Sequence, residues 1–318
     1  MRVALAAALV IGVAASLASA AAPPRWTKAA PVPLARTEVA AVLAANEIYV
    51  IGGYTQDGHN SARVDAYSPR TNRWRRLPDL PITVDHTMAA AYRGRVYVVG
   101  GYGGEGHARM TTLFVLAKGA WTTLTPMPEQ RAAGGAAVVN GKLYVVGGTT
   151  SATIGAPRAA NDLATATLVY DIARDSWSRA PGPTKREHLG VTALNGIIYA
   201  VGGRLGGADT NMQVFESFTP SARAWRRLAP VPGRRGGTAV AATGRTIVSV
   251  GGETPTETIR TAYAYNTRTR RWRRLPNLPT PRHGLGAVAF GKRIYVLGGG
   301  RQPGLGGVSG VNEVLALP

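Results

Sequence analysis

The sequence contains no cysteine among its 318 residues. A disulfide framework, a thiolate metal site and a lipid-modified amino-terminal cysteine are therefore excluded, so the fold must rest on packing and strand pairing. Acidic residues are also scarce, with 17 Asp and Glu against 37 Lys and Arg, which gives a formal net charge of +20. This imbalance favours anionic partners and speeds their encounter, but it does not identify a fold.

Long apolar runs are missing except at the start of the chain. Residues 1–22 carry Arg2, then an uncharged apolar stretch, then Ala18, Ser19 and Ala20. This order predicts a secretory signal peptide over residues 1–20, cleaved after Ala20, and a periplasmic or secreted mature protein. An uncleaved membrane anchor is the alternative, because the run is almost long enough to span a bilayer. We expect no stable membrane insertion after signal cleavage.

One short pattern, an apolar run closed by two glycines, occurs six times at spacings of 47 to 55 residues. A unit of this size cannot bury a core alone and has to stack with its neighbours. We therefore predict a single repeat domain over residues 23–318. The first glycines of the pairs are Gly52, Gly100, Gly147, Gly202, Gly251 and Gly298.

Each repeat carries four segments with strand and turn signals. A small-residue run, a tight turn such as Asn140-Gly141, a Tyr-containing run and a third strand precede a fourth strand built on Trp. Every Trp lies 25 or 26 residues before the next glycine pair, so length variation is confined to the loop between the second and third strands. The longest such loop, residues 149–167, is interpreted either as a lid or as a tolerated insertion.

The two ends of the chain complement each other. Trp26 has no glycine pair before it, and the pair at 298–299 has no Trp after it. We predict that residues 24–30 complete the last repeat by lying beside residues 311–317. A ring closed in this way removes most exposed sheet edges.

Paired glycines after an apolar strand, an upstream Tyr and a downstream aromatic and Trp at these spacings resemble kelch repeats. Six of them resemble the all-β, six-bladed kelch β-propeller, with four antiparallel strands per blade. The resemblance covers residues 24–318, with Val248 replacing the Tyr of the fifth unit. It implies a binding mouth at the loop-rich end of the propeller. A copper radical oxidase of the galactose oxidase kind, also built on kelch repeats, is excluded because its cross-linked Cys is absent from this chain.

Five arginines recur sixteen residues before the glycine pairs, where the second repeat has Val84. In one interpretation, each Arg bonds backbone carbonyls of its own inter-blade loop. In the other, they form a cationic ring that receives a carboxylate, sulfate or phosphate. The five are Arg36, Arg131, Arg186, Arg235 and Arg282.

Further polar residues are predicted at the same mouth, either just after the arginine position or just after the glycine pairs. They are Glu38, Tyr54, Asp85, His86, Tyr102, Glu187, His188, Arg204, Glu253 and His283. We interpret them as hydrogen-bonding pocket residues, because adjacent residues on a strand point opposite ways and seldom act together. A metal cluster of His86, His188 and His283 would need the three rings to converge across a wide channel. We therefore expect no metal and no cofactor.

Three functions stay open. The first is a monomeric binding protein that recognises an anionic glycan or a protein segment. The second is an acid-sugar mutarotase, because the chain is similar in fold and export to the periplasmic kelch-type sialic acid mutarotase; that resemblance implies Glu187, His188 and Arg204 as catalytic candidates. The third is a structural or assembly role. No nucleic-acid partner is expected, since the basic residues are scattered and form no recognised module.

Overall fold

The computed structural model of the chain describes residues 23–104, 107–150 and 163–318. The predicted signal peptide, residues 1–20, and residues 151–162 of the long loop lie outside these ranges. Within them the fold is all-β, because strands alternate with turns and one short 3-10 helix, η2 (Ala208–Thr210). No helix of the described ranges is long and apolar enough to cross a membrane.

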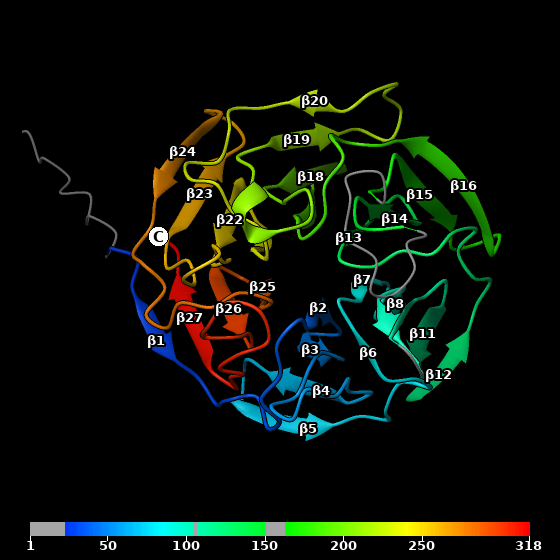
Figure 1. Cartoon of the computed structure of the whole chain (residues 1–318), viewed down its shortest axis with the longest axis horizontal. Helices are drawn as coiled ribbons and strands as arrows, with labels where there is room; N and C mark the ends of the chain where they lie inside the picture. The colour runs from blue at the N-terminus through cyan, green and yellow to red at the C-terminus, as the bar shows by residue number, and fades with distance from the viewer. Residues whose placement is uncertain (1–22, 105–106, 151–162) are drawn as a thin grey trace, which may run out of the picture.

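In the described part of the chain, six four-stranded antiparallel sheets surround a central axis, which is the arrangement of a β-propeller (Figure 1). Four sheets are made of consecutive strands: β2 (Ala40–Ala44), β3 (Glu47–Ile51), β4 (Val64–Ser68) and β5 (Arg73–Arg76); β13 (Gly135–Val139), β14 (Lys142–Val146), β15 (Ala166–Asp171) and β16 (Ser176–Pro181); β17 (Gly190–Leu194), β18 (Ile197–Val201), β19 (Phe215–Phe218) and β20 (Arg226–Arg227); β21 (Ala239–Thr243), β22 (Thr246–Val250), β23 (Ala262–Asn266) and β24 (Arg271–Arg274).

The other two sheets combine strands that are not consecutive. The sheet of the second repeat contains β7 (Met88–Tyr92), β8 (Arg95–Val99), β11 (Leu113–Ala117) and β12 (Ala120–Thr123). A small three-stranded sheet beside it contains β6 (Val84–Asp85), β9 (Tyr102–Gly103) and β10 (Ala108–Arg109). The sheet that joins the two chain ends contains β25 (Gly286–Phe290), β26 (Arg293–Leu297), β27 (Asn312–Ala316) and β1 (Trp26–Lys28). Its strands β1 and β27 are antiparallel, with Trp26 opposite Leu315.

One strand of each four-stranded sheet lies next to the axis; these strands are β2, β7, β13, β17, β21 and β25. Strand β2 contacts both β7 and β25, and the contacts continue from β7 through β13, β17 and β21 to β25. Alanine and valine side chains of these strands line a central channel. The last strands lie at the periphery, as Figure 1 shows for β1, β5, β12, β16, β20 and β24.

The buried core lies between neighbouring sheets. Val64 and Ala66 of β4 pack against Val96 and Val98 of β8, for example. The sheets of the first and last repeats pack in the same way, and the rings of Tyr67 and Tyr295 lie 5.7 Å apart there. The apolar runs of the repeats therefore become faces that bury one another, as expected of a unit that has no core of its own.

The six tryptophans join the sheets to one another. Each indole Nε1–H donates, over 2.8 to 2.9 Å, to the carbonyl oxygen four residues after the Trp of the preceding repeat. Trp26 follows the same rule across the chain ends, because it donates to Pro276, four residues after Trp272. The acceptors of Trp26, Trp74, Trp121, Trp177, Trp225 and Trp272 are Pro276, Ala30, Pro78, Thr125, Pro181 and Ala229.

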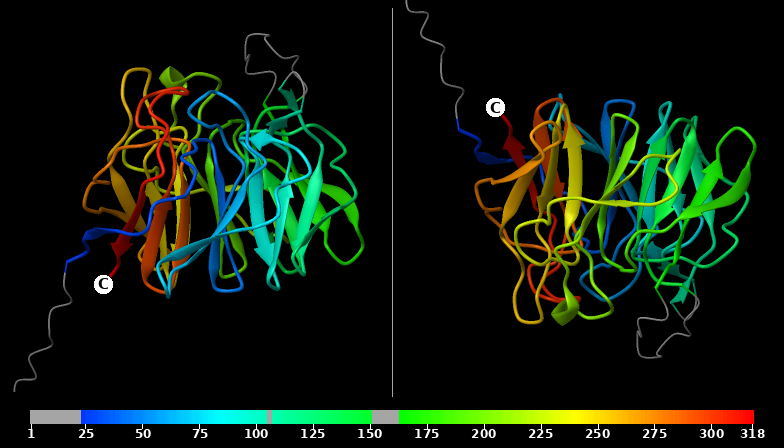
Figure 2. Two further views of the ribbon diagram at one scale, coloured as in Figure 1. Left: turned by 90° about the horizontal axis from the view of Figure 1, so that it is seen from below. Right: turned by 90° about the horizontal axis from the view of Figure 1, so that it is seen from above.

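The longer loops project from one end of the molecule, as the two side views in Figure 2 show. They include the loops of residues 204–211 and 300–311, which connect β18 to β19 and β26 to β27. We call this end the mouth of the channel. The short turns between the first and second strands, such as Asn140-Gly141, lie at the opposite end.

Candidate functional site

The second glycine of each pair binds the next repeat. Its N–H donates over 2.8 to 2.9 Å to the carbonyl oxygen of the residue at the predicted arginine position. The first glycine must lack a side chain, because a Cβ at Gly100 would lie 2.2 Å from the carbonyl oxygen of Arg131. The bonded pairs are Gly53 with Val84, Gly101 with Arg131, Gly148 with Arg186, Gly203 with Arg235, Gly252 with Arg282 and Gly299 with Arg36.

The five arginines of the predicted cationic ring are at most 1% exposed. Four of them donate to the carbonyl oxygen of the first glycine in their own repeat. Arg235 instead donates to the Thr261 hydroxyl, over 2.7 Å. Three arginines also pair with a buried acid: Arg36 with Asp65 at 2.6 Å, Arg186 with Glu216 at 2.6 Å and Arg282 with Glu313 at 2.9 Å.

This placement corrects the interpretation of these arginines as an anion-binding ring. Burial lowers the pKa of each guanidinium, to about 10 for four of them, and those four remain protonated at neutral pH. An anion from solvent cannot reach them, because their side chains are enclosed and already bonded. The structure supports the other interpretation, in which each arginine holds its own loop. The corrected residues are Arg36, Arg131, Arg186, Arg235 and Arg282.

A ring of left-handed residues surrounds the channel just inside the mouth. One residue of each repeat, two positions after the arginine position, has a φ between 46° and 65°. In five of the six, the N–H donates over 2.7 to 3.2 Å to the carbonyl oxygen of the equivalent residue in the preceding repeat. For Glu38, the N–H of the next residue, Val39, donates instead to Gly284 at 3.2 Å. Because non-glycine residues seldom adopt positive φ, side chains held this way deserve a functional interpretation. The six are Glu38, His86, Ala133, His188, Gly237 and Gly284.

Seven side chains form a closed network across this ring. Starting from Glu38, the contacts run Oε2 to His86 Nε2 at 3.2 Å, on to His188 Nε2 at 3.0 Å, and from His188 Nδ1 to Glu187 Oε2 at 2.8 Å. Arg204 then donates to Glu187 Oε1 at 2.9 Å and to Glu253 Oε1 at 2.6 Å. His283 Nδ1 completes the network, 3.6 Å from Glu253 Oε2 and 3.2 Å from Glu38 Oε1.

A second group of side chains extends this network from His86. Asp85 contacts His86 Nδ1 through one carboxylate oxygen, and His107 Nε2 lies 2.8 Å from the other. The Tyr54 hydroxyl bonds to His107, and the ring of Tyr102 stacks on His107 with centroids 5.0 Å apart. Sequence reasoning missed His107, because it lies in the loop between the second and third strands, whose length and residues vary from repeat to repeat. The one available signal was the scarcity of histidine, with five in the whole chain.

The electrostatics of the network favour the ionised forms of Glu38 and Asp85. Burial acts to raise the pKa of Glu38, but the nearby His86 and His283 outweigh it and hold this pKa well below its usual range. Burial also acts to raise the pKa of Asp85, but His107 and His86 outweigh it, so this pKa is lowered. Burial, assisted by Arg204, lowers the pKa of His188. For His283, burial is outweighed by Glu38 and Glu253, so its pKa is raised.

The space at the level of the ring is small. Glu38, His86 and His188 line a cavity of about 150 Å³, together with small residues such as Ala133 and Gly237. This volume lies below the roughly 300–1,000 Å³ of typical small-molecule pockets.

The structure brings together ten residues predicted at the mouth. Apart from the five arginines, every predicted residue belongs to the network around Glu38 or to its extension around His86. The three mutarotase candidates are also adjacent, but Arg204 already donates to two glutamates. The ten are Glu38, Tyr54, Asp85, His86, Tyr102, Glu187, His188, Arg204, Glu253 and His283.

The fold and its repeated contacts agree with comparisons to known proteins. A family model described as the KLHDC2/KLHL20/DRC7 Kelch-repeats domain matches residues 22–182 and 155–299. The chain is 30% identical over 161 residues to Kelch-like protein terF of Aspergillus terreus, a match that covers 48% of this chain and 35% of the relative. It is 32% identical over 120 residues to Kelch repeat and BTB domain-containing protein 12 of Homo sapiens, covering 35% and 19%.

Kelch-like protein 35 of Mus musculus matches a longer segment, with 25% identity over 210 residues, or 65% of this chain and 33% of the relative. The chain thus spans about a third or less of the length of these curated relatives. The family model, by contrast, covers most of the chain. On these matches and on its repeated glycine and tryptophan contacts, the chain belongs to the kelch-repeat family.

Proposed function

We propose that this chain is an exported, monomeric kelch-repeat binding module that takes a protein segment at the mouth of a closed, six-bladed propeller. Membership of the kelch-repeat family supports a binding role. The pairing of β1 with β27 supports closure of the ring. Arg2, the apolar run and the Ala18-Ser19-Ala20 sequence support export.

The proposal of a protein partner rests on two exposed leucines at the mouth. In the described ranges, Leu205 and Leu305 are the only large apolar side chains that are exposed, at 37% and 53%. Each directly follows a residue that binds Glu253: Arg204 donates to Oε1 at 2.6 Å, and the Gly304 N–H donates to Oε2 at 2.9 Å. Single exposed leucines are common on protein surfaces. This pair is informative because both lie beside the buried network around Glu38, as an apolar rim that a peptide side chain can cover.

A variant with Asp at both leucines tests this proposal. We expect Leu205→Asp/Leu305→Asp to retain the fold but to lose partner binding at least tenfold, since a charge in an apolar contact leaves it desolvated and unpaired. The mature chain, residues 21–318, would be immobilised and exposed to extracts of the native host's envelope and medium. Captured proteins would be quantified by mass spectrometry, and the affinity of the strongest would be measured directly.

The matched control places the same two charges at the opposite end of the channel. Asn46→Asp/Asn195→Asp changes exposed turn residues with φ of 64° and 51°, a conformation that Asp tolerates as well as Asn. This control should bind the partner as the unmodified chain does. Equal binding by both double variants would reject the mouth as the partner site.

An anionic glycan is the second candidate, and the net charge of +20 favours it. Exposed arginines of the outer strands, such as Arg73 and Arg75 of β5, provide that charge at the periphery rather than at the network. Acidic oligosaccharides that bind at low and at high salt would support this candidate, whereas no binding at either would remove it. The mutarotase hypothesis has less support, because Nε and Nη1 of Arg204 already donate to Glu187 and Glu253.

A further inference from the structure

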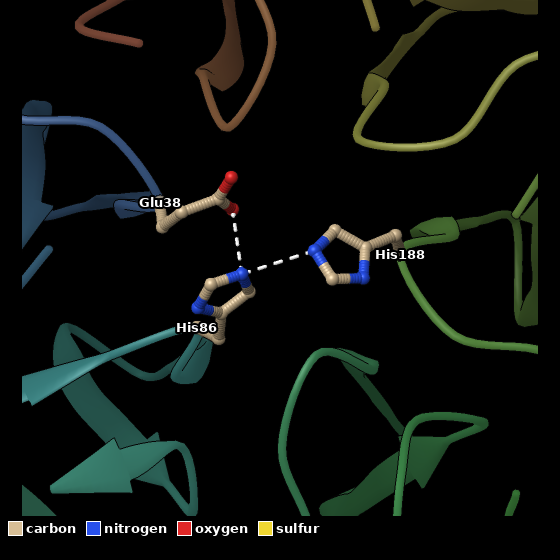
Figure 3. Close-up of side chains that lie close together, drawn as sticks. All are labelled: Glu38, His86 and His188. Atoms are coloured by element: carbon tan, nitrogen blue, oxygen red, sulfur yellow. Dashed lines mark hydrogen bonds and ion pairs between the residues drawn. The ribbon is translucent and has the colours of Figure 1, made fainter. Parts of the chain in front are cut away.

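Three side chains from three different sheets converge on the channel axis. Glu38 precedes β2, His86 precedes β7 and His188 precedes β17, and Figure 3 shows their polar ends turned toward one another. His86 Nε2 lies 3.0 Å from His188 Nε2 and 3.2 Å from Glu38 Oε2. One donor atom from each residue lies within 4.8 Å of the other two. The left-handed backbone at all three positions aims these side chains inward.

Buried carboxylates set the orientation of both imidazole rings. Asp85 contacts His86 Nδ1, and Glu187 Oε2 lies 2.8 Å from His188 Nδ1. An ionised carboxylate only accepts hydrogen bonds, so the His86 Nδ1 bonded to Asp85 carries the proton. The close approach of Glu187 to His188 Nδ1 favours the same tautomer in that ring. The neutral form of each ring therefore presents the lone pair of Nε2. Two such lone pairs face each other at 3.0 Å, an arrangement that needs a cation or a shared proton between them.

The carboxylates are themselves held in place. His107 Nε2 lies 2.8 Å from Asp85, and Arg204 Nε donates to Glu187 at 2.9 Å. Neither Asp85 nor Glu187 has measurable exposure. A histidine whose second nitrogen bonds a fixed carboxylate is the usual outer-shell arrangement around metal-binding imidazoles, because it fixes the tautomer and raises the basicity of the ligand.

We propose that Glu38, His86 and His188 bind a divalent transition-metal ion of the zinc class. Zinc prefers imidazole nitrogen and carboxylate oxygen at about 2.0–2.1 Å, and sites with three protein ligands keep a position open for water or a ligand. Two nitrogens 3.0 Å apart subtend an angle of about 95° at an ion at those distances. Rotation of the Glu38 side chain toward His188 brings in the third donor. The open position faces the cavity of about 150 Å³.

His283 is not part of this set, although it was grouped with His86 and His188 in the sequence. Its Nδ1 lies 3.2 Å from Glu38 Oε1, and its Nε2 lies 2.9 Å from the Gln302 carbonyl oxygen. One nitrogen thus contacts the proposed ligand Glu38 and the other contacts the backbone outside the site. His283 is a positioning residue that holds the Glu38 carboxylate.

Titration of the chelator-treated, full mature chain with Zn²⁺ alone tests the proposal. We expect one equivalent to bind by isothermal titration calorimetry, with a rise in the thermal midpoint. Co²⁺ in its place should give visible absorption bands of nitrogen and oxygen coordination. His86→Asn and His188→Asn should each weaken binding by more than about 100-fold, since outer-shell changes alone cost 10–100-fold. Asn is chosen because it tolerates the positive φ at both positions.

Two control variants make the result specific. His59→Asn changes a loop histidine whose side chain is 80% exposed, and it should bind Zn²⁺ as the unmodified chain does. His283→Asn should still bind one equivalent of Zn²⁺. This result would distinguish the proposed site from a cluster of His86, His188 and His283. Circular dichroism of each metal-free variant checks the fold. No uptake of Zn²⁺ or Co²⁺ by the unmodified chain, or unchanged uptake by both folded His86 and His188 variants, overturns the proposal in favour of a proton shared between the rings. Partner binding plays no part in these measurements, so they are independent of the proposed function.

Discussion

Replacing Arg282 with Met is expected to destabilise the protein by about 3–5 kcal/mol, the usual cost of breaking a buried ion pair from one side. Arg282 Nη2 lies 2.9 Å from Glu313 Oε2, and the two side chains are 0% and 1% exposed. Its Nη1 also donates to the carbonyl oxygens of Gly298 and Val311, at 2.5 and 2.8 Å. Met fills a similar volume but leaves the carboxylate and both carbonyls without this donor. Urea unfolding monitored by tryptophan fluorescence measures the change.

Two further variants separate the ion pair from the arginine itself. Arg235→Met should cost less, because Arg235 bonds Thr261 and pairs with no acid among the residues that the structure describes. Arg282→Met/Glu313→Met should recover much of the loss, since a buried pair replaced by apolar residues is often neutral or stabilising. A single Arg282→Met variant no less stable than Arg235→Met would contradict the assignment of Arg282 as a buried structural residue.

Deleting β1 is expected to cost about 3 kcal/mol, comparable to removing a packed Trp side chain. The deletion removes the pairing of Trp26, Thr27 and Lys28 with β27 and the indole bond to Pro276. It also exposes the edge of β27, whose Leu315 is fully buried. At roughly 2–4 °C per kcal/mol, the thermal midpoint should fall by about 6–12 °C.

A shorter deletion serves as the control for this loss. A chain that begins at Arg25 lacks only residues 21–24 of the mature chain, of which Pro23 and Pro24 are exposed or half-buried, and it should unfold at the midpoint of the mature chain. A chain that begins at Ala29 should show the full loss. Equal midpoints for the two would mean that β1 contributes nothing to the last sheet.

The repeats could be predicted from the sequence because the residues that make contacts between repeats recur at constant spacing. The constant interval from Trp to the glycine pair reflects two hydrogen bonds in each repeat. The indole bonds one neighbouring repeat, and the N–H of the second glycine bonds the other. An insertion between the Trp and the glycine pair would break one of these two bonds. Trp26 has no glycine pair before it, which likewise indicated a contact with the last repeat. Its indole N–H donates to the carbonyl oxygen of Pro276 there.

The role of the arginines could not be decided from sequence. Their recurrence fits a ligand-binding ring and a loop-holding residue equally well, and only burial separates the two. The acids that partner three of them, Asp65, Glu216 and Glu313, recur near the start of the third strand. That recurrence was a usable signal, because an acid at a buried strand position requires a cation nearby.

The geometry of the mouth depended on backbone conformation that sequence patterns do not reveal. Asp85-His86 and Glu187-His188 were expected to point apart, as neighbours on a strand do. Both histidines instead adopt φ near 50°, which turns each acid toward the Nδ1 of the histidine beside it. The residues predicted at the mouth lie together in the structure, but the sequence could not anticipate how their side chains converge.

The central claim is that the chain closes on itself, because only closure places Glu38 of the first repeat beside His283 of the last. Thr27 and Val314 are direct partners across β1 and β27, and antiparallel partners lie about 4.5–5.5 Å apart at Cα, within disulfide range. Thr27→Cys/Val314→Cys introduces the only two thiols of the chain. We expect an intramolecular disulfide to form on mild oxidation, seen as the loss of two hydrogens by intact-mass spectrometry and as a raised thermal midpoint. Two thiols that both remain reactive toward maleimide in the folded, oxidised sample would contradict closure.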